Sequence, residues 1–542
     1  MIKVSQQYKQ AVYAPTRRTS AKVSFEIFDN PAYEDNTSTV TSEATLSRKQ
    51  QLTNKIRFMT HKYATFERDY FKLDGSFHIP PKSNEGNSEL GWWSGDICDE
   101  NGVFNPYQVL EFNFTEEHNS MGLTISFDTM ANEYASDFDI EVYRLNGALI
   151  HKEIVANNSA PLYVLVKGLD NYGKIAITIK KWAKPYRRVR VTEVDFGVIK
   201  EYKGDKLIKL NIIEEMNIIS DKIPSNELKF IIDNSSKEFN ILNPEGFYRF
   251  LKERQEVKAA IGVEIAENEF EYIGMGKFYL TDWQSDEGAL TTTLVARDIF
   301  ELLDQKEYTS ITNTNLYDLA EDILIKSGVE NYYIDEELRG INTAGFPKKL
   351  TARKALQYIG IAGKAAVYQD RQGLLQIKQF KVLDERDTQY IYFAGPDMFT
   401  GMIYPMVDEG YDMKNITFDN VYKEPQIKLD KLLYSLTMVI NGAVKTETVF
   451  YNPGIKEGSA LKCDNPLINT VEHAQDIAEW IISEYNLRAL YNINWRQNPC
   501  LECGDIVLVE DSFQAKKQSR ITKQEFEYTG YLSGRTETKG GV

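Results

Sequence analysis

At 542 residues, the chain is long enough for roughly three to five domains of about 100–200 residues each. The 32 Tyr and 27 Phe, with many runs of Thr, Val and Ile, favour β-sheet. The net charge of −16 argues against a nucleic-acid reader, because neutralising phosphates needs a basic face. It suits a surface past which DNA slides without binding, although acidic proteins are usually acidic for solubility alone.

The cysteines and the first residues favour synthesis in a reducing cytoplasm. The start contains no apolar segment of signal-peptide length, and no window approaches a membrane span. Cys500 and Cys503 have C-x-x-C spacing, but no second pair has zinc spacing and no strand-then-helix redox setting surrounds them. We therefore expect neither a metal site nor a cofactor.

The first 200 residues read as an N-terminal arm followed by a β-sandwich. Residues 1–55 are polar, except that alternation over residues 20–28 predicts a half-buried strand. From residue 56 to 198, short alternating strands predict a sandwich of jelly-roll size. Asn146-Gly147 predicts a hairpin turn between two of these strands. The expected strands are 110–114, 123–127, 138–143 and 174–180.

Residues 199–310 read as a small β-barrel that carries a helix. We expect the helix at residues 244–252, with Pro244 in its first turn. The expected strands are 207–213, 227–233, 276–283 and 289–296.

Residues 311–380 read as an α+β module. Residues 316–326 place apolar side chains on one helical stripe that Gly328 ends, and Thr351 caps a second helix. A hairpin over 365–378 is expected to turn at Asp370 to Gly373.

The last part reads as a connector, residues 381–425, and a second barrel, residues 426–542. A strand at 432–440 opens this barrel, a helix at 471–491 crosses it, and a strand at 506–509 follows the loop 498–505. The fold class expected for the whole chain is mainly β with α+β parts.

The order barrel, helix–helix–hairpin, barrel resembles the baseplate hub and tail-tip proteins of bacteriophage tails. The carrying segments are the two helices with the hairpin at Asp370 to Gly373, the crossing helix after Thr470, and the strand entry from Pro499 to Val509. The resemblance covers roughly residues 200–542, and its motifs are individually loose. It implies a non-enzymatic virion tail protein, a homotrimer whose two barrels per chain form a six-fold-like ring, and neighbours among the tube, baseplate and tape-measure proteins.

The β-sandwich departs from that pattern and looks like a galactose-binding-like jelly roll. We interpret it as an insertion into the first barrel, because the strand at 20–28 has no partner nearby while the barrel beginning at Leu207 has room for one.

A glycan is the candidate ligand of the sandwich. Trp92 and Trp93 are candidate stacking residues for a sugar ring, and Asp74, Asp96 and Asp99 are candidate acceptors for its hydroxyl groups. The alternative is that strand alternation places one Trp in the core and leaves the other at a rim. Asp96 to Gly102 fails the EF-hand spacing, so we expect no calcium site there.

Catalytic motifs are missing from the sequence. None of the five His forms H-E-x-x-H, and no Gly-x-Ser-x-Gly elbow or phosphate-binding loop is present. The leading hypothesis is therefore a structural ring through which DNA only passes. The alternative is a peripheral attachment protein that binds cell-wall glycan, and a third possibility is a wall-degrading enzyme built on β-modules.

Overall fold

The computed structural model describes residues 1–57, 59, 61–80, 89–240, 243, 254–284, 290–381, 383, 395–396, 403–404, 415–510 and 516–541. The chain forms two compact units, one made of Met1–Ser24 with Glu201–Val542 and the other of Phe25–Lys200. The second unit thus interrupts the first in sequence. Among the described residues, no helix has the length and apolar character needed to span a bilayer.

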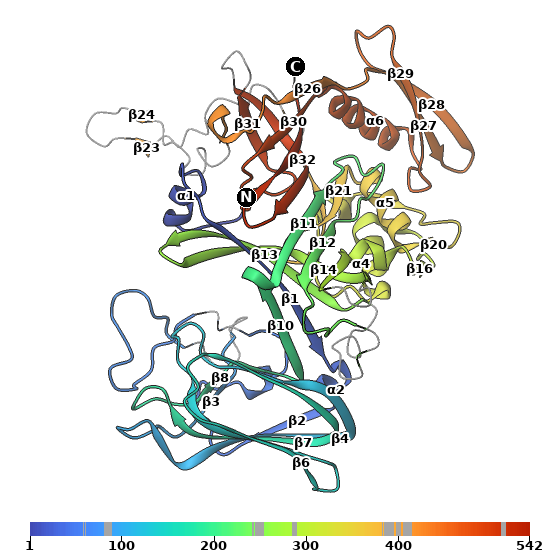
Figure 1. Ribbon diagram of the computed structural model, residues 1–542. Helices are drawn as coiled ribbons and strands as arrows, with labels where there is room; N and C mark the ends of the chain where they lie inside the picture. The colour runs from blue at the N-terminus through green and yellow to red at the C-terminus, as the bar shows by residue number, and fades with distance from the viewer. Residues whose placement is uncertain are drawn as a thin grey trace. The chain divides into compact units, whose positions relative to one another are not determined.

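The first unit is built on a 13-stranded sheet (Figure 1). Its main path runs β10-β1-β13-β14-β15-β12-β11-β32-β33-β30-β26, and β31 pairs with β32 and with β25. The strands are β1 (Thr19–Phe28), β10 (Gly197–Lys203), β11 (Leu207–Glu215), β12 (Glu227–Asp233), β13 (Glu256–Ala266), β14 (Glu269–Gln284), β15 (Thr291–Arg297), β25 (Asn415–Ile416), β26 (Gln426–Leu429), β30 (Ala489–Trp495), β31 (Ile506–Glu510), β32 (Lys516–Tyr528) and β33 (Leu532–Gly540).

We call residues 199–310 the first β-region and residues 426–542 the second. The four strands predicted for the first β-region are present in this sheet as β11, β12, β14 and β15. The segment 20–28 is β1, and its sheet neighbours are β13 and β10. The strand β13 was missed, although its Val257, Ile261 and Val263 are buried. The helix expected at 244–252 lies outside the described residues.

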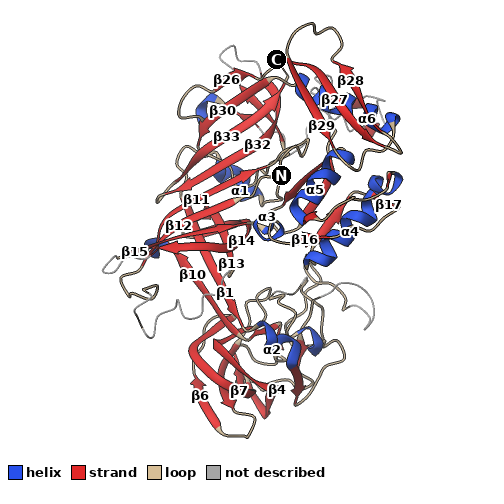
Figure 2. Ribbon diagram, turned by 90° about the vertical axis from the view of Figure 1, so that its right-hand side faces the viewer, coloured by secondary structure: helices blue, strands red, loops and turns tan. Residues whose placement is uncertain are grey.

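The α+β module agrees with its prediction. Helix α4 (Leu316–Ser327) ends at Gly328, whose φ of +76° lies in the left-handed region that glycine adopts without strain. Helix α5 (Ala352–Ala362) is capped by Thr351, whose side chain accepts from Lys354 N. The hairpin of β21 (Ala365–Gln369) and β22 (Leu375–Gln379) turns where expected. Figure 2 shows these helices beside the sheet strands.

Shorter elements complete the module. They are α3 (Ile299–Leu303), β16 (Glu307–Tyr308), β17 (Thr314–Asn315), β18 (Tyr332–Ile334), β19 (Asn342–Thr343) and β20 (Leu350–Thr351). Most of the connector 381–425 lies outside the described residues, apart from short pieces such as β23 (Gly395–Pro396) and β24 (Ile403–Tyr404).

The last region differs from its prediction in two ways. The strand expected to open the second barrel is β27 (Leu433–Asn441), which forms a separate sheet with β28 (Lys445–Tyr451) and β29 (Ser459–Asp464). The crossing helix α6 (Val471–Asn486) is shorter than predicted, because Ala489 to Tyr491 already belong to β30. Apolar side chains of β27 and α6 pack in one core with those of the α+β module.

The N-terminal arm contains a short helix that the sequence did not predict, α1 (Gln6–Val12). It lies in a segment tied to the loop before β31. The Met1 ammonium donates to Asp505 at 2.6 Å, and the Arg17 guanidinium donates to the carbonyl of Gln497 at 2.8 Å. The N-terminal arm is therefore held against residues 497–505 within the first unit.

The second unit is a β-structure with a six-stranded sheet in the order β2-β4-β7-β5-β6, with β9 on β4, and a separate pair β3-β8. Residues 36–40, assigned to the arm from sequence, form β2 in this sheet. The predicted strands 110–114 and 123–127 are two parts of the long β4, and the hairpin at Asn146-Gly147 joins β5 to β6. The elements are α2 (Asn30–Asp35), β2 (Asn36–Val40), β3 (Trp92–Trp93), β4 (Val103–Ser126), β5 (Ala135–Tyr143), β6 (Leu149–Val155), β7 (Leu162–Trp182), β8 (Arg190–Val191) and β9 (Glu193–Asp195).

Candidate functional site

The two tryptophans singled out from the sequence are both fully buried. They are neighbours on β3, so their side chains enter opposite faces and pack in two different cores. Trp92 Nε1 donates to the Ser42 carbonyl at 2.9 Å, and Trp93 Nε1 donates to the Leu90 carbonyl at 3.0 Å. Neither indole presents a face to a ligand, which argues against the predicted stacking role. The alternative prediction placed one tryptophan in the core and the other at a rim. It was right for Trp92 and wrong for Trp93, which is also buried.

Trp93 lies in a small core with Met59, Tyr63 and Leu90, none of which belongs to the six-stranded sheet of the second unit. The Arg190 guanidinium stands 4.4 Å from the Trp93 ring centroid and 4.2 Å from that of Tyr70. The segment carrying Tyr63 and Tyr70 therefore covers this tryptophan. Sequence alternation could not show this cover, because it depends on contacts with a distant irregular segment.

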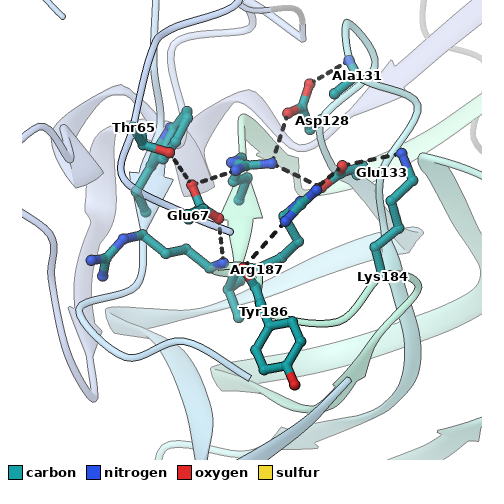
Figure 3. A network of polar contacts seen from close by, with 12 residues as sticks. Thr65, Glu67, Asp128, Ala131, Glu133, Lys184, Tyr186 and Arg187 are labelled. Carbon is teal, nitrogen blue, oxygen red and sulfur yellow. Dashed lines mark hydrogen bonds and ion pairs between the residues drawn. The ribbon is translucent and has the colours of Figure 1, made fainter. Parts of the chain in front are cut away.

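A buried charge network holds the covering segment in place (Figure 3). Arg190 pairs with Glu67 at 2.6 Å, Glu133 at 2.9 Å and Asp128 at 3.3 Å, and all four side chains are almost inaccessible. Arg187 reaches Glu133 at 3.2 Å. Three carboxylates from two segments, Glu67 and the connection between β4 and β5, thus converge on one guanidinium.

The pKa shifts in this network follow from burial and from the cations. Burial raises the pKa of Asp128. Burial alone would raise the pKa of Glu133 too, but Arg190, Lys184 and Arg187 lower it overall. Each carboxylate contacts at least one cation, and Arg190 links Glu67 of the covering segment to Asp128 and Glu133.

The three predicted acidic residues occupy turns. Asp74 is exposed and accepts from the Ser76 hydroxyl, a hydrogen bond that lowers the pKa of Asp74. Asp96 accepts from Gln108 Nε2 at 3.1 Å. Asp99 accepts from the backbone N–H groups of Asn101 and Val103, each at 2.8 Å. Within the part of the chain that the structure describes, no group of acidic, His or Cys residues is arranged to hold a metal ion.

A second candidate site is the junction between the two β-regions of the first unit. β11 pairs antiparallel with β32, from Leu210 opposite Tyr528 to Glu215 opposite Lys523. Lys209 lies 2.6 Å from Glu527 on the neighbouring strand, an exposed pair of opposite charges that agrees with this register. Figure 2 shows β33, β32, β11 and β12 as successive strands. The two regions therefore share one continuous sheet.

This sheet ends in an unusual edge strand. β26 pairs on one side with β30, and among the described strands none occupies its other side. All four of its residues are exposed, including Ile427 at 54% and Leu429 at 53%. Ile427 lies opposite the buried Tyr491, so the apolar face of the sheet continues onto an uncovered edge. The sequence of β26 alternates polar and apolar residues over only four positions. That pattern is too short to identify an edge strand directly after the connector.

Part of the chain matches solved phage tail proteins. A tail protein from Neisseria meningitidis MC58 matches 63% of this chain and 93% of its own, with 11% identity and a TM-score of 0.43. The 43 kDa tail protein of prophage MuSo2 from Shewanella oneidensis matches 62% of this chain and 94% of its own, with 14% identity and a TM-score of 0.39.

A carbohydrate-binding module also matches part of the chain. The family 32 module of NanJ from C. perfringens, solved with galactose, matches 33% of this chain and 99% of its own, with 13% identity and a TM-score of 0.20. No protein-family model and no curated protein matches the sequence. At these identities the similarity concerns the fold alone.

Proposed function

We propose that the chain is a non-enzymatic structural protein of a phage tail tip or baseplate hub, which assembles into a ring continuing the tail tube. The observation that carries this proposal is the single sheet through both β-regions, ending at the exposed strand β26. A strand with one free edge and exposed apolar side chains is prone to aggregation in a monomer, and its free edge can pair with a strand of another chain.

Ring closure needs two different edges on each subunit. The sheet path has two ends, β26 and β10, which are far apart in sequence order and unlike in composition. Head-to-tail pairing of unlike edges closes a cyclic ring when the rotation fits, and the hub resemblance of residues 200–542 implies a homotrimer. The same proposal includes three further points: each β-region closes into a barrel, the neighbours of the ring are other tail proteins, and the protein is located in the virion tail. It also includes the insertion of the second unit into the first barrel.

The negative net charge agrees with a ring through whose channel DNA passes. A chain of charge −16 repels phosphates, so transit would not be slowed by specific binding.

Cryo-electron microscopy of the native particle, or of the purified chain, tests the proposal directly. We expect a three-fold ring with six β-regions around a channel. A peripheral location on fibres, or a chain that stays monomeric in its assembled particle, would refute it.

A double variant tests the edge itself. Ile427→Lys with Leu429→Lys should leave the subunit folded and abolish the oligomer in sedimentation-velocity runs, because two charges cannot be buried at the joint. Ile325→Lys is the matched control, since Ile325 is 62% exposed but lies on α4 and not on a strand edge. Loss of the oligomer in both would show a general effect of charge.

The alternative function is host attachment through glycan, with Trp92, Trp93, Asp74, Asp96 and Asp99 as the binding residues. It has less support, because both indoles are buried. Binding of the purified chain to cell-wall glycan, lost on alanine substitution at both tryptophans with the fold intact, would favour it over the ring.

A further inference from the structure

A cavity of about 430 Å³ lies in the first unit, beside the end of the β11–β32 junction at Glu215 and Lys523. Its wall is formed by the turn after β11, the end of α6, and the strands β32 and β33. Met216, Ile218 and Leu487 supply an apolar side, and each of them is buried. Charged side chains form the rest of the cavity wall.

Two of these charged side chains are buried with only some of their polar atoms paired; Arg520 Nη2 donates to the Lys381 carbonyl. Arg520 and Glu484 are 4% and 5% exposed, and their nearest charged atoms, Nη1 and Oε1, stand 3.6 Å apart. Within the described residues, Nε and Nη1 of Arg520 and Oε1 of Glu484 have no hydrogen-bond partner. A buried polar group without a partner is costly, so two such groups at one cavity mark a place where a ligand would be stabilised.

Burial also shifts the pKa values of this pair. Burial lowers the pKa of Arg520, although Glu484 opposes that shift, and burial raises the pKa of Glu484. Each group therefore lacks the solvation that its charge requires.

The other charges around the cavity largely satisfy one another. Glu215 pairs with Lys222 at 2.9 Å and with Lys523 at 3.5 Å, and Asp430 stands 3.8 Å from Lys539. Both signs of charge therefore face the cavity, and neither an anion nor a cation would find a one-sided field there.

We propose that this cavity binds a neutral polyhydroxylated ligand of the size of a mono- or disaccharide. A hydroxyl group both donates and accepts, so adjacent hydroxyls satisfy Glu484 Oε1 and the Arg520 N–H groups together. The C–H groups of the ligand pack on Met216, Ile218 and Leu487. This site lies within the first unit, and its wall shares Glu215 and Lys523 with the β11–β32 junction.

Calorimetric titration of the full chain with D-galactose, D-glucose and N-acetyl-D-glucosamine tests the proposal, with glucuronate and glucosamine as charged counterparts. We expect at least one neutral sugar to bind saturably at one site per chain, and more tightly than its charged counterpart. Arg520→Gln and Glu484→Gln should each weaken binding by about tenfold or more, since each removes a hydrogen bond to a charged group. Glu447→Gln is the matched control, because Glu447 is exposed and pairs with Lys462 on a different sheet.

A third variant keeps the test decisive if the charge variants fail to fold. Ile219→Trp narrows the cavity from its partly buried rim without removing either charged group. It should abolish binding and preserve the fold. Absence of binding by all three neutral sugars overturns the proposal, and so does binding that none of the three variants weakens, because the sugar would then lie elsewhere.

Discussion

The guanidinium of Arg190 lies 4.4 Å from the ring centroid of Trp93, and its Nη2 donates to Glu67 at 2.6 Å. The ring face that the sequence suggested for a ligand is thus covered by a residue of the same unit. The same guanidinium reaches Asp128 and Glu133, so one side chain joins an aromatic core to three carboxylates. The second unit should therefore depend on this residue for its stability.

Replacing Arg190 by Met should destabilise the second unit by about 3–5 kcal/mol, because buried carboxylates lose their cation. Hydrogen exchange of peptides from residues 61–70 should accelerate most, since Glu67 holds that segment. Lys174→Met is the control, because its pair with Glu111 is part-exposed and should change stability by no more than about 1 kcal/mol. Equal losses of stability in the two variants would contradict the role of Arg190 in holding the segment 61–70.

Replacing Trp93 by Ala should destabilise the second unit by about 3–5 kcal/mol through the cavity it leaves. Denaturant unfolding of the variant and of Ile154→Ala gives the comparison, since Ile154 is 66% exposed and contributes little. A Trp93→Ala chain of unchanged stability would show that this tryptophan is not a core residue, and would restore the ligand hypothesis.

Replacing Gly534 by Ala should weaken the shared sheet by about 1–3 kcal/mol. A Cβ atom at this position would stand 1.9 Å from the carbonyl oxygen of Glu525 on β32. Gly274 on β14 is the matched control, because a Cβ there meets nothing within 4 Å and its φ is not positive. We expect a lower thermal midpoint for Gly534→Ala alone, and a fall of equal size in both variants would refute the close approach.

The stability of the first unit should depend on pH through Asp298. This carboxylate caps α3 and accepts from Ser225 Oγ at 2.6 Å and from Asn226 N at 2.8 Å, yet burial raises its pKa to about 6. The folded state therefore holds a proton more tightly than the unfolded state, whose Asp pKa is near the ordinary value of 3.8. The stabilisation is full below about pH 4 and is lost as pH rises through 6, to a limit of about 3 kcal/mol.

Unfolding free energies of wild type and Asp298→Asn at pH 4, 5, 6 and 7 check this prediction. The variant should show a smaller decrease between pH 4 and 6, whatever its absolute stability. Asp304→Asn at the other end of α3, which is 58% exposed, is the control and should follow the wild-type curve. Parallel curves for wild type and Asp298→Asn would exclude Asp298 as the source.

Local signals in the sequence predicted much of the secondary structure. Gly328 and Thr351 mark a helix end and a helix start through backbone geometry and capping, which involve only neighbouring residues. The strand predicted at 432–440 is present as β27, but its placement in the second barrel was wrong, because a local pattern does not specify which sheet a strand joins. The prediction also failed at the end of α6, where Ala489 to Tyr491 continue a helical pattern but form β30.

The sequence by itself determined that this is a mainly β protein with an α+β module near its centre, because period-two alternation, caps and turn residues are local properties. Only the tertiary structure decided that Leu210 lies opposite Tyr528, that Trp93 is covered, and that β26 ends the sheet with its apolar side chains exposed. Those outcomes depend on contacts between residues far apart in the chain, and no local pattern specifies which distant segment fills a given edge or face.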